Sequence, residues 1–359
     1  MEVRKLNWFL PVFLAVYVIL NIAAGIFIGI APELGIELPD WIVYVISEVM
    51  AFIIVLIYML VMKINIRRDM QYKVIGGKDI FMSLLTGVLI LPMVLFLNAF
   101  TMLFSDNYIQ ESSHGLLEYP YIAQLILIAV IPPLVEEFIF RGLFFGTYRK
   151  CGVLKAALMS GLVFGMFHLN INQFAYALVS GVIFAYMAEA TGSIWSSVIA
   201  HFVVNSYSIT INQILKLSGL YSAVNDTATG TQDELTSITM SSRLAGITMS
   251  SRLAGIFMMF VIGAVFMLLA VLCIRNMAKR NGRLEVIRES FRIGHKKGSY
   301  NNFSSEGASG NGELLSADNM SGDGEVLSDT AARSNHVLTA PAVASVAACL
   351  VYMIIMEMA

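Results

Sequence analysis

The stretch that decides the fold is residues 121–148, YIAQLILIAVIPPLVEEFIFRGLFFGTY. It is long enough to cross the ~30 Å hydrocarbon core of a bilayer, which takes about 20 apolar residues in a helix. Three charged side chains interrupt it: Glu136, Glu137 and Arg141. A charge near the bilayer centre costs at least ~2.5 kcal/mol on insertion scales, so such residues are functional candidates. The stretch predicts a membrane-spanning helix that carries part of a functional site.

The rest of the chain repeats the apolar pattern. Of its 359 residues, 57% are hydrophobic and 13% are charged, whereas soluble domains are ~25% charged. This composition excludes a disordered chain, a nucleic-acid binder with a basic face and nearly every class of soluble enzyme. It predicts an all-α, polytopic transmembrane bundle of eight spans, with the lipid bilayer as partner and no nucleic acid. The spans are 8–30, 41–62, 80–104, 121–148, 153–168, 174–190, 194–214 and 254–274, and a short ninth apolar segment lies at 340–356.

The charges of the loops predict the orientation of these spans. Lys and Arg gather in residues 4–5, 63–79, 149–155 and 275–283, whereas loops 31–40 and 105–120 contain acidic residues and neither Lys nor Arg. Basic loops mark the cytoplasmic side of a membrane protein. Basic and acidic loops alternate as eight spans with both ends in the cytoplasm require.

Composition also divides the chain into three parts. Residues 1–281 form the expected transmembrane domain, 282–338 are rich in Ser, Gly, Asn and Asp and predict a flexible polar tail, and 339–359 form an apolar C-terminal segment. An exact repeat, ITMSSRLAG, occupies Ile238–Gly246 and Ile247–Gly255. Nine residues are too few for a solenoid unit, and we assign the repeat no function.

Nearly all of the ionisable residues inside the spans lie in spans four, five and seven. His168 lies in FGMFHLN, and His201 precedes Asn205 by four residues in HFVVN. At ~1.5 Å per residue, Glu136, His168 and His201 lie roughly 18, 22 and 14 Å from the cytoplasmic ends of their helices. The depths are similar enough for the three side chains to converge in one buried pocket.

Spacing distinguishes the two neighbouring acids. Glu137 precedes Arg141 by four residues, which is the favourable order for an ion pair within a helix. Glu136 is turned from this pair by about 100° and is therefore free to point elsewhere.

A free buried Glu, two His and an Asn indicate hydrolysis by water. A desolvated carboxylate serves as a general base toward water, and His and Asn donate hydrogen bonds to an oxyanion. No Ser or Cys accompanies a His as a nucleophile. The competing interpretation is that these groups are polar contacts that hold helices together.

At these residues the chain resembles the CPBP family of intramembrane proteases, which includes type II CAAX prenyl proteases and the Abi and bacteriocin-processing relatives. The family motifs EExxxR, FxxxH and HxxxN/D correspond to Glu136-Glu137-xxx-Arg141, Phe164-xxx-His168 and His201-xxx-Asn205. The resemblance covers residues 80–214.

The resemblance implies an endopeptidase of the bacterial plasma membrane with a peptide or lipid-anchored protein as substrate. Glu136 would activate the attacking water and His168 would hold it. His201 and Asn205 would stabilise the oxyanion, and Glu137 and Arg141 would form a structural ion pair.

Two questions stay open at this point. Glu136, His168 and His201 are also the residues that would bind Zn²⁺ as a His₂Glu site, although we favour a mechanism with no metal and no cofactor. The alternatives to an enzyme are a non-catalytic membrane scaffold and a proton-coupled transporter, because buried Glu and His also form proton relays.

Overall fold

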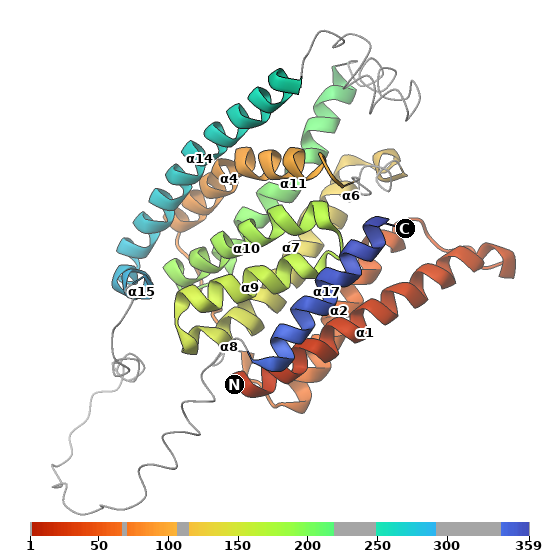
Figure 1. Ribbon diagram of the computed structural model, residues 1–359, viewed down its shortest axis with the longest axis horizontal. Coiled ribbons are helices and arrows are strands. Elements are labelled where there is room, and N and C mark those ends of the chain that lie inside the picture. Colours follow the sequence, from red (N-terminus) through yellow and green to blue (C-terminus); the bar gives the residue numbers. More distant parts are fainter. Residues whose placement is uncertain (1, 67–69, 106–114, 219–248, 292–338, 359) are drawn as a thin grey trace, which may run out of the picture.

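The computed structural model describes residues 2–66, 70–105, 115–218, 249–291 and 339–358. These residues form helices and contain no β-strand, so the predicted all-α fold is confirmed for the described part of the chain. Figure 1 shows them as one bundle of tilted helices. The longer helices are α1 (Val3–Ile30), α2 (Ile42–Val61), α4 (Gly77–Thr101), α9 (Val153–Phe167), α10 (Ile171–Thr191), α11 (Trp195–Leu217), α14 (Met249–Arg280) and α17 (Ala340–Met358).

Between α4 and α9 the span Tyr121–Cys151 is built from short segments of different helical type. It contains α6 (Tyr121–Gln124), the π-helix η3 (Leu125–Val130), α7 (Ile131–Glu137), the π-helix η4 (Phe138–Phe145), α8 (Gly146–Tyr148) and η5 (Arg149–Cys151). π-helical turns are rare and are frequently found at functional sites. This span carries the charged residues of the sequence prediction.

Seven of the described helical stretches are long and apolar enough to cross a membrane, and α9 and α17 are shorter. The fifth predicted span, 153–168, is the one that differs. Its helix α9 has 15 residues, about 22 Å at the usual rise, which is less than the ~30 Å hydrocarbon core. α9 packs closely on α10 inside the bundle.

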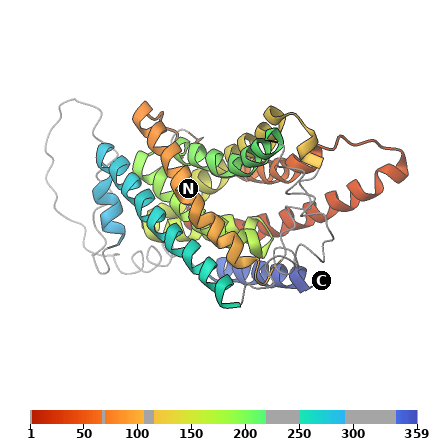
Figure 2. The same cartoon turned by 90° about the horizontal axis from the view of Figure 1, so that it is seen from above.

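The C-terminal apolar segment is helical and packs on the bundle. Helix α17 begins near the N-terminal end of α1 and runs beside it (Figure 1). Its Ala342 and Cys349 are buried, and the Cys349 thiol contacts the Met166 carbonyl of α9. In both views the second half of α1 extends away from the other helices (Figures 1 and 2).

Small residues allow α9 and α10 to approach closely where they cross. A Cβ added to Gly161 of α9 would lie 2.9 Å from the Leu178 carbonyl, and one added to Gly181 of α10 would lie 2.8 Å from the Gly161 Cα. The crossing therefore admits no side chain at either position. A Cβ added to Gly25 or Gly29, the GxxxG pair of α1, would have no atom within 4 Å. The GxxxG spacing alone therefore does not identify a helix contact.

The loops that the charge pattern assigns to one side of the membrane meet at one end of the bundle. Glu189, at the end of α10, binds both Arg149 and Arg283, at 2.8 and 2.6 Å. Asn281 binds Asp79 at the start of α4, and Ser193 binds the Lys73 carbonyl. The Tyr148 hydroxyl also donates to Asn7 of α1 at 2.8 Å. These bonds join five parts of the chain at this end: residue 7 and residues 73–79, 148–149, 189–193 and 281–283.

The polar tail predicted over 282–338 begins with a helix instead. Helix α15 (Leu284–Ser290) packs against α9 and α10, because its Val286 and Ile287 contact the apolar core. Residues 292–338 lie outside the described residues. So does the first copy of the nonapeptide repeat, whereas Met249–Gly255 of the second copy forms the start of α14.

Candidate active site

The two neighbouring acids of α7 are both buried and point to different partners. Glu136 is 4% exposed, and Glu137 and Arg141 are fully buried. Arg141 donates from Nη1 to Glu137 Oε1 at 2.8 Å. This is the ion pair that the spacing predicts, and it leaves Glu136 to face other groups.

His201 of α11 lies between the two acids. Its Nδ1 is 3.0 Å from Glu137 Oε1, and its Nε2 is 3.4 Å from Glu136 Oε2. Glu137 therefore holds His201 as well as Arg141, which sequence spacing did not predict because the bond joins residues 64 positions apart.

His168 reaches Glu136 from the other side. It follows the last residue of α9, and its Nδ1 is 2.9 Å from the Phe164 carbonyl. Its Nε2 is 4.0 Å from Glu136 Oε1. The next residue, Leu169, has φ of 53°, which is a strained conformation for a side chain of this size. Asn170 then caps α10 by accepting from the Gln173 amide.

The two histidines present the same ring nitrogen to the same carboxyl group. A carbonyl oxygen only accepts hydrogen bonds, so His168 Nδ1 carries the proton and its Nε2 faces Glu136. The distances from Nε2 to the carboxyl oxygens, 4.0 Å for His168 and 3.4 Å for His201, are longer than a good direct hydrogen bond. Distances of this kind suit a bridging water.

Aromatic rings surround the charged cluster. The Arg141 guanidinium lies 4.5 Å from the centre of the Phe164 ring, and the Phe164 ring meets both His168 and His201 edge-on. Phe184 stacks on His201 at 5.0 Å. The rings exclude water and offer their faces to the guanidinium, whose Nε and Nη2 have no hydrogen-bond partner among the described residues.

Asn205 lies one turn beyond His201 on α11 and binds the backbone of the neighbouring span. Its Nδ2 donates to the Ile128 carbonyl at 3.1 Å. That carbonyl has no donor in its own helix, because Pro132 and Pro133 lack the amide hydrogens that would reach it. Asn205 satisfies this carbonyl with one of its two amide hydrogens.

One buried acid near this cluster lies outside the predicted set. Glu48 of α2 is 7% exposed, and its carboxyl interacts electrostatically with that of Glu136. The sequence signal for it was present, since Glu48 is the one acid within span 41–62.

A zinc ion needs ligand atoms that converge on one point at about 2 Å. Among the described residues, no group of three His, Cys, Asp or Glu side chains is arranged to hold a metal ion. The side chains as placed do not fit zinc.

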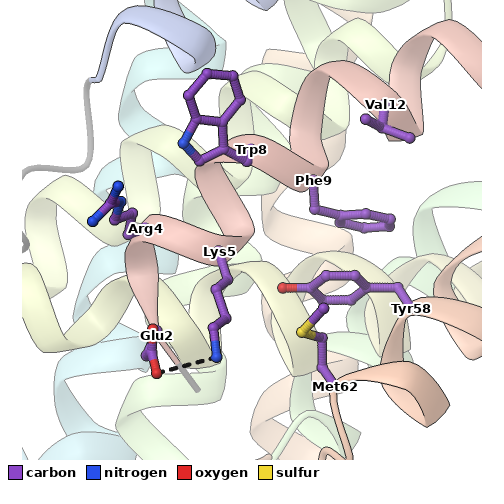
Figure 3. Close-up of a pocket in the computed structure, with 8 residues that line it drawn as sticks. All are labelled: Glu2, Arg4, Lys5, Trp8, Phe9, Val12, Tyr58 and Met62. Atoms are coloured by element: carbon purple, nitrogen blue, oxygen red, sulfur yellow. Dashed lines mark ion pairs between the residues drawn. The ribbon is translucent and has the colours of Figure 1, made fainter.

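A cavity of about 470 Å³ lies elsewhere, between the N-terminal end of α1 and the C-terminal end of α2 (Figure 3). Lys5 pairs with Glu2 at its edge, at 3.2 Å, and Phe9 stacks on Tyr58 at 3.8 Å. None of the predicted site residues lines it.

Comparison with known proteins adds to this geometry. Residues 118–207 match the family model described as type II CAAX prenyl endopeptidase Rce1-like. The chain is 28% identical over 102 residues to a protein of Bacillus subtilis (strain 168) named "Putative membrane peptidase YdiL", a match that covers 28% of this chain and 42% of that protein. No solved structure matches. Over residues 118–207 the chain is thus similar to the type II CAAX prenyl endopeptidases of the CPBP family, and it spans less than half the length of the Bacillus relative that it matches.

Proposed function

We propose that this protein is an intramembrane endopeptidase that hydrolyses a peptide bond with water activated by Glu136. The observation that carries the proposal is that the Nε2 atoms of His168 and His201 face the two oxygens of one buried carboxyl group. In this proposal the attacking water binds between Glu136, as the base, and the two histidines, as further hydrogen-bonding groups. The family-model match and the name of the Bacillus relative support a peptidase.

In the proposed first step, Glu136 accepts a proton from the water as its oxygen attacks the carbonyl carbon of the scissile bond. His168 orients this water by accepting its second hydrogen at Nε2, because Nδ1 is held by the Phe164 carbonyl. General-base catalysis of this kind contributes typically 10²–10⁴-fold to the rate.

In the second step, the tetrahedral oxyanion collapses and the bond between carbon and nitrogen breaks. His201 in its imidazolium form donates from Nε2 to the oxyanion, and the second amide hydrogen of Asn205 donates as well. Glu136 returns its proton to the leaving nitrogen, so that the products are a carboxylic acid, which keeps the second hydrogen of the water, and an amine. Glu137 and Arg141 keep the His201 ring in place.

The proposal includes no metal ion. A membrane scaffold and a proton-coupled transporter are the alternatives, because each would also use a buried Glu and His cluster. The same proposal includes a peptide or lipid-anchored protein as substrate. It also places the protein in the bacterial plasma membrane with its basic loops in the cytoplasm.

Reconstitution in proteoliposomes separates these functions. The probes are a farnesylated peptide ending in a CAAX sequence, the same peptide without its lipid, and a pH-sensitive dye inside the vesicles. Peptide cleavage without proton flux is expected, whereas flux without cleavage, or binding without either, contradicts the proposal. Elemental analysis of the active protein, with activity measured after chelation, tests the metal-free mechanism.

A further inference from the structure

Glu48 is a buried acid that the proposed mechanism does not use. It lies within the membrane-spanning helix α2, it is 7% exposed, and its Oε2 has no hydrogen-bond partner in the described part of the chain. An ionisable side chain at such a position costs free energy and is rare in membrane helices unless it has a partner or a function. A buried oxygen without a donor adds a further cost.

Helix α2 packs on the span that carries Glu136. Phe52, one turn after Glu48 on α2, contacts the Phe138 ring of that span at 5.5 Å. Glu48 lies about 20 Å from the end of α2 at Val61, close to the ~18 Å depth of Glu136.

Electrostatic interactions agree with this placement. The Glu48 and Glu136 carboxyl groups interact with each other, and the hydroxyl of Tyr17, on α1, interacts with both. Helix α2 also packs directly on α7, which carries Glu136.

The charges of this region are unbalanced. Three carboxyl groups, those of Glu48, Glu136 and Glu137, share it with the guanidinium of Arg141, which pairs with Glu137. The two histidines lie next to Glu136. Among the described residues, the Glu48 Oε2 atom has no hydrogen-bond partner.

We infer that Glu48 is a substrate-binding residue, whose carboxylate receives a positively charged side chain of the substrate close to the scissile bond. This inference rests on the proposed function and adds a substrate class to it, a membrane segment with a Lys or Arg near the cleaved bond. A cation in this place supplies the missing donor of Glu48, and a charge-assisted hydrogen bond in a low-dielectric site is strong.

Binding to an inactive protein tests this inference without requiring turnover. The Glu136→Gln protein in nanodiscs is titrated with fluorescent single-span peptides that carry either lysine or norleucine at matched central positions. At the best position we expect the lysine peptide to bind about tenfold more tightly than the norleucine peptide. Adding Glu48→Gln should abolish the difference and leave the norleucine affinity unchanged.

Two control variants distinguish charge recognition from a structural effect. Glu48→Asp keeps the charge and should keep the lysine preference. Ser83→Ala removes a buried hydroxyl on α4 that, like the Glu48 Oε2 atom, has no hydrogen-bond partner among the described residues. This variant should not alter the preference. Equal affinity for the two peptides, failure of both to bind, or an equal loss for both in Glu48→Gln would overturn the inference.

Cleavage of the norleucine peptide by the protein with native Glu136 tests the proposed function separately. Cleavage without a lysine preference removes this inference alone. A lysine preference in binding without any cleavage removes the proposed peptidase activity and leaves the binding role of Glu48.

Discussion

At the scale of residues, the site depends on one ring that joins two acids. His201 contacts Glu137 through Nδ1 and faces Glu136 through Nε2, so the neighbouring acids of the EExxxR motif have separate tasks. Glu137 contacts the ring and Arg141, whereas the oxygens of Glu136 face the two histidines, where we propose that the water binds. The motif spacing predicted this division, but not that the second acid also holds the histidine.

Removing Arg141 should destabilise the protein strongly. Arg141→Met leaves Glu137 buried without its cation, and breaking a buried pair costs typically ~3–5 kcal/mol. The double variant Arg141→Met with Glu137→Gln should recover a large part of this loss, because no unpaired charge stays behind. Unfolding in mild detergent measures the stability of both variants. If Arg141→Met alone is as stable as the native protein, the buried ion pair does not stabilise the fold as we claim.

Asn205 binds the helix backbone and is also proposed to stabilise the oxyanion. Asn205→Ala removes the donor to the Ile128 carbonyl, and an unsatisfied buried acceptor costs about 1–3 kcal/mol. We expect lower thermal stability together with lower kcat. Thr210→Val is the control, since it removes a hydroxyl from the same helix, which bonds to Tyr121 and Ser206. If Asn205→Ala lowers kcat with unchanged stability, the backbone role is wrong.

At the scale of elements, the active span combines prolines, π-helical turns and a partner helix. Pro132 and Pro133 are visible in the sequence and predict a break in backbone hydrogen bonding. The π-helices on either side of α7 were not predicted, because tertiary contacts such as the bond from Asn205 decide how the broken stretch winds. The sequence also did not predict that α9 is too short to span the hydrocarbon core. Hydropathy does not show that the helix ends at Phe167, directly before His168.

The crossing of α9 and α10 should tolerate no added methyl group. Gly181→Ala places a Cβ within 3.0 Å of Arg141 Nη2 and still closer to Gly161, and such overpacking costs typically 1–3 kcal/mol. We expect a lower unfolding temperature and reduced activity. Gly25→Ala has open space around it and serves as the matched control, so equal effects of the two variants would contradict this crossing.

At the scale of the whole molecule, the bundle has one end where distant loops are tied together. Glu189 with Arg149 and Arg283 forms its centre, and the charges of the loops predict that these segments lie on the same side of the membrane. Hydropathy and loop charge together predicted nearly every helix. They did not predict α15, because Val286 and Ile287 are too few apolar residues to indicate a helix by hydropathy. Their role as core contacts is seen only in the folded structure.

Labelling of single cysteines tests the orientation that we propose. In a protein without its three native cysteines, Lys150→Cys should react with a membrane-impermeant maleimide only when the cytoplasmic face is accessible. Glu33→Cys should react in intact cells, because loop 31–40 is acidic and predicted to lie outside. The reverse pattern would overturn the orientation and leave the fold intact.

The central claim is that the Glu136 carboxylate activates water, and its most direct test is the cleavage rate of Glu136→Gln in proteoliposomes. Glutamine keeps the shape of the side chain and removes the base. We predict a loss of at least about 10²-fold in kcat, with normal membrane insertion and unchanged unfolding temperature, whereas Glu118→Gln, at an exposed position, stays at the native rate. A Glu136→Gln protein that cleaves the peptide at the native rate would contradict the account.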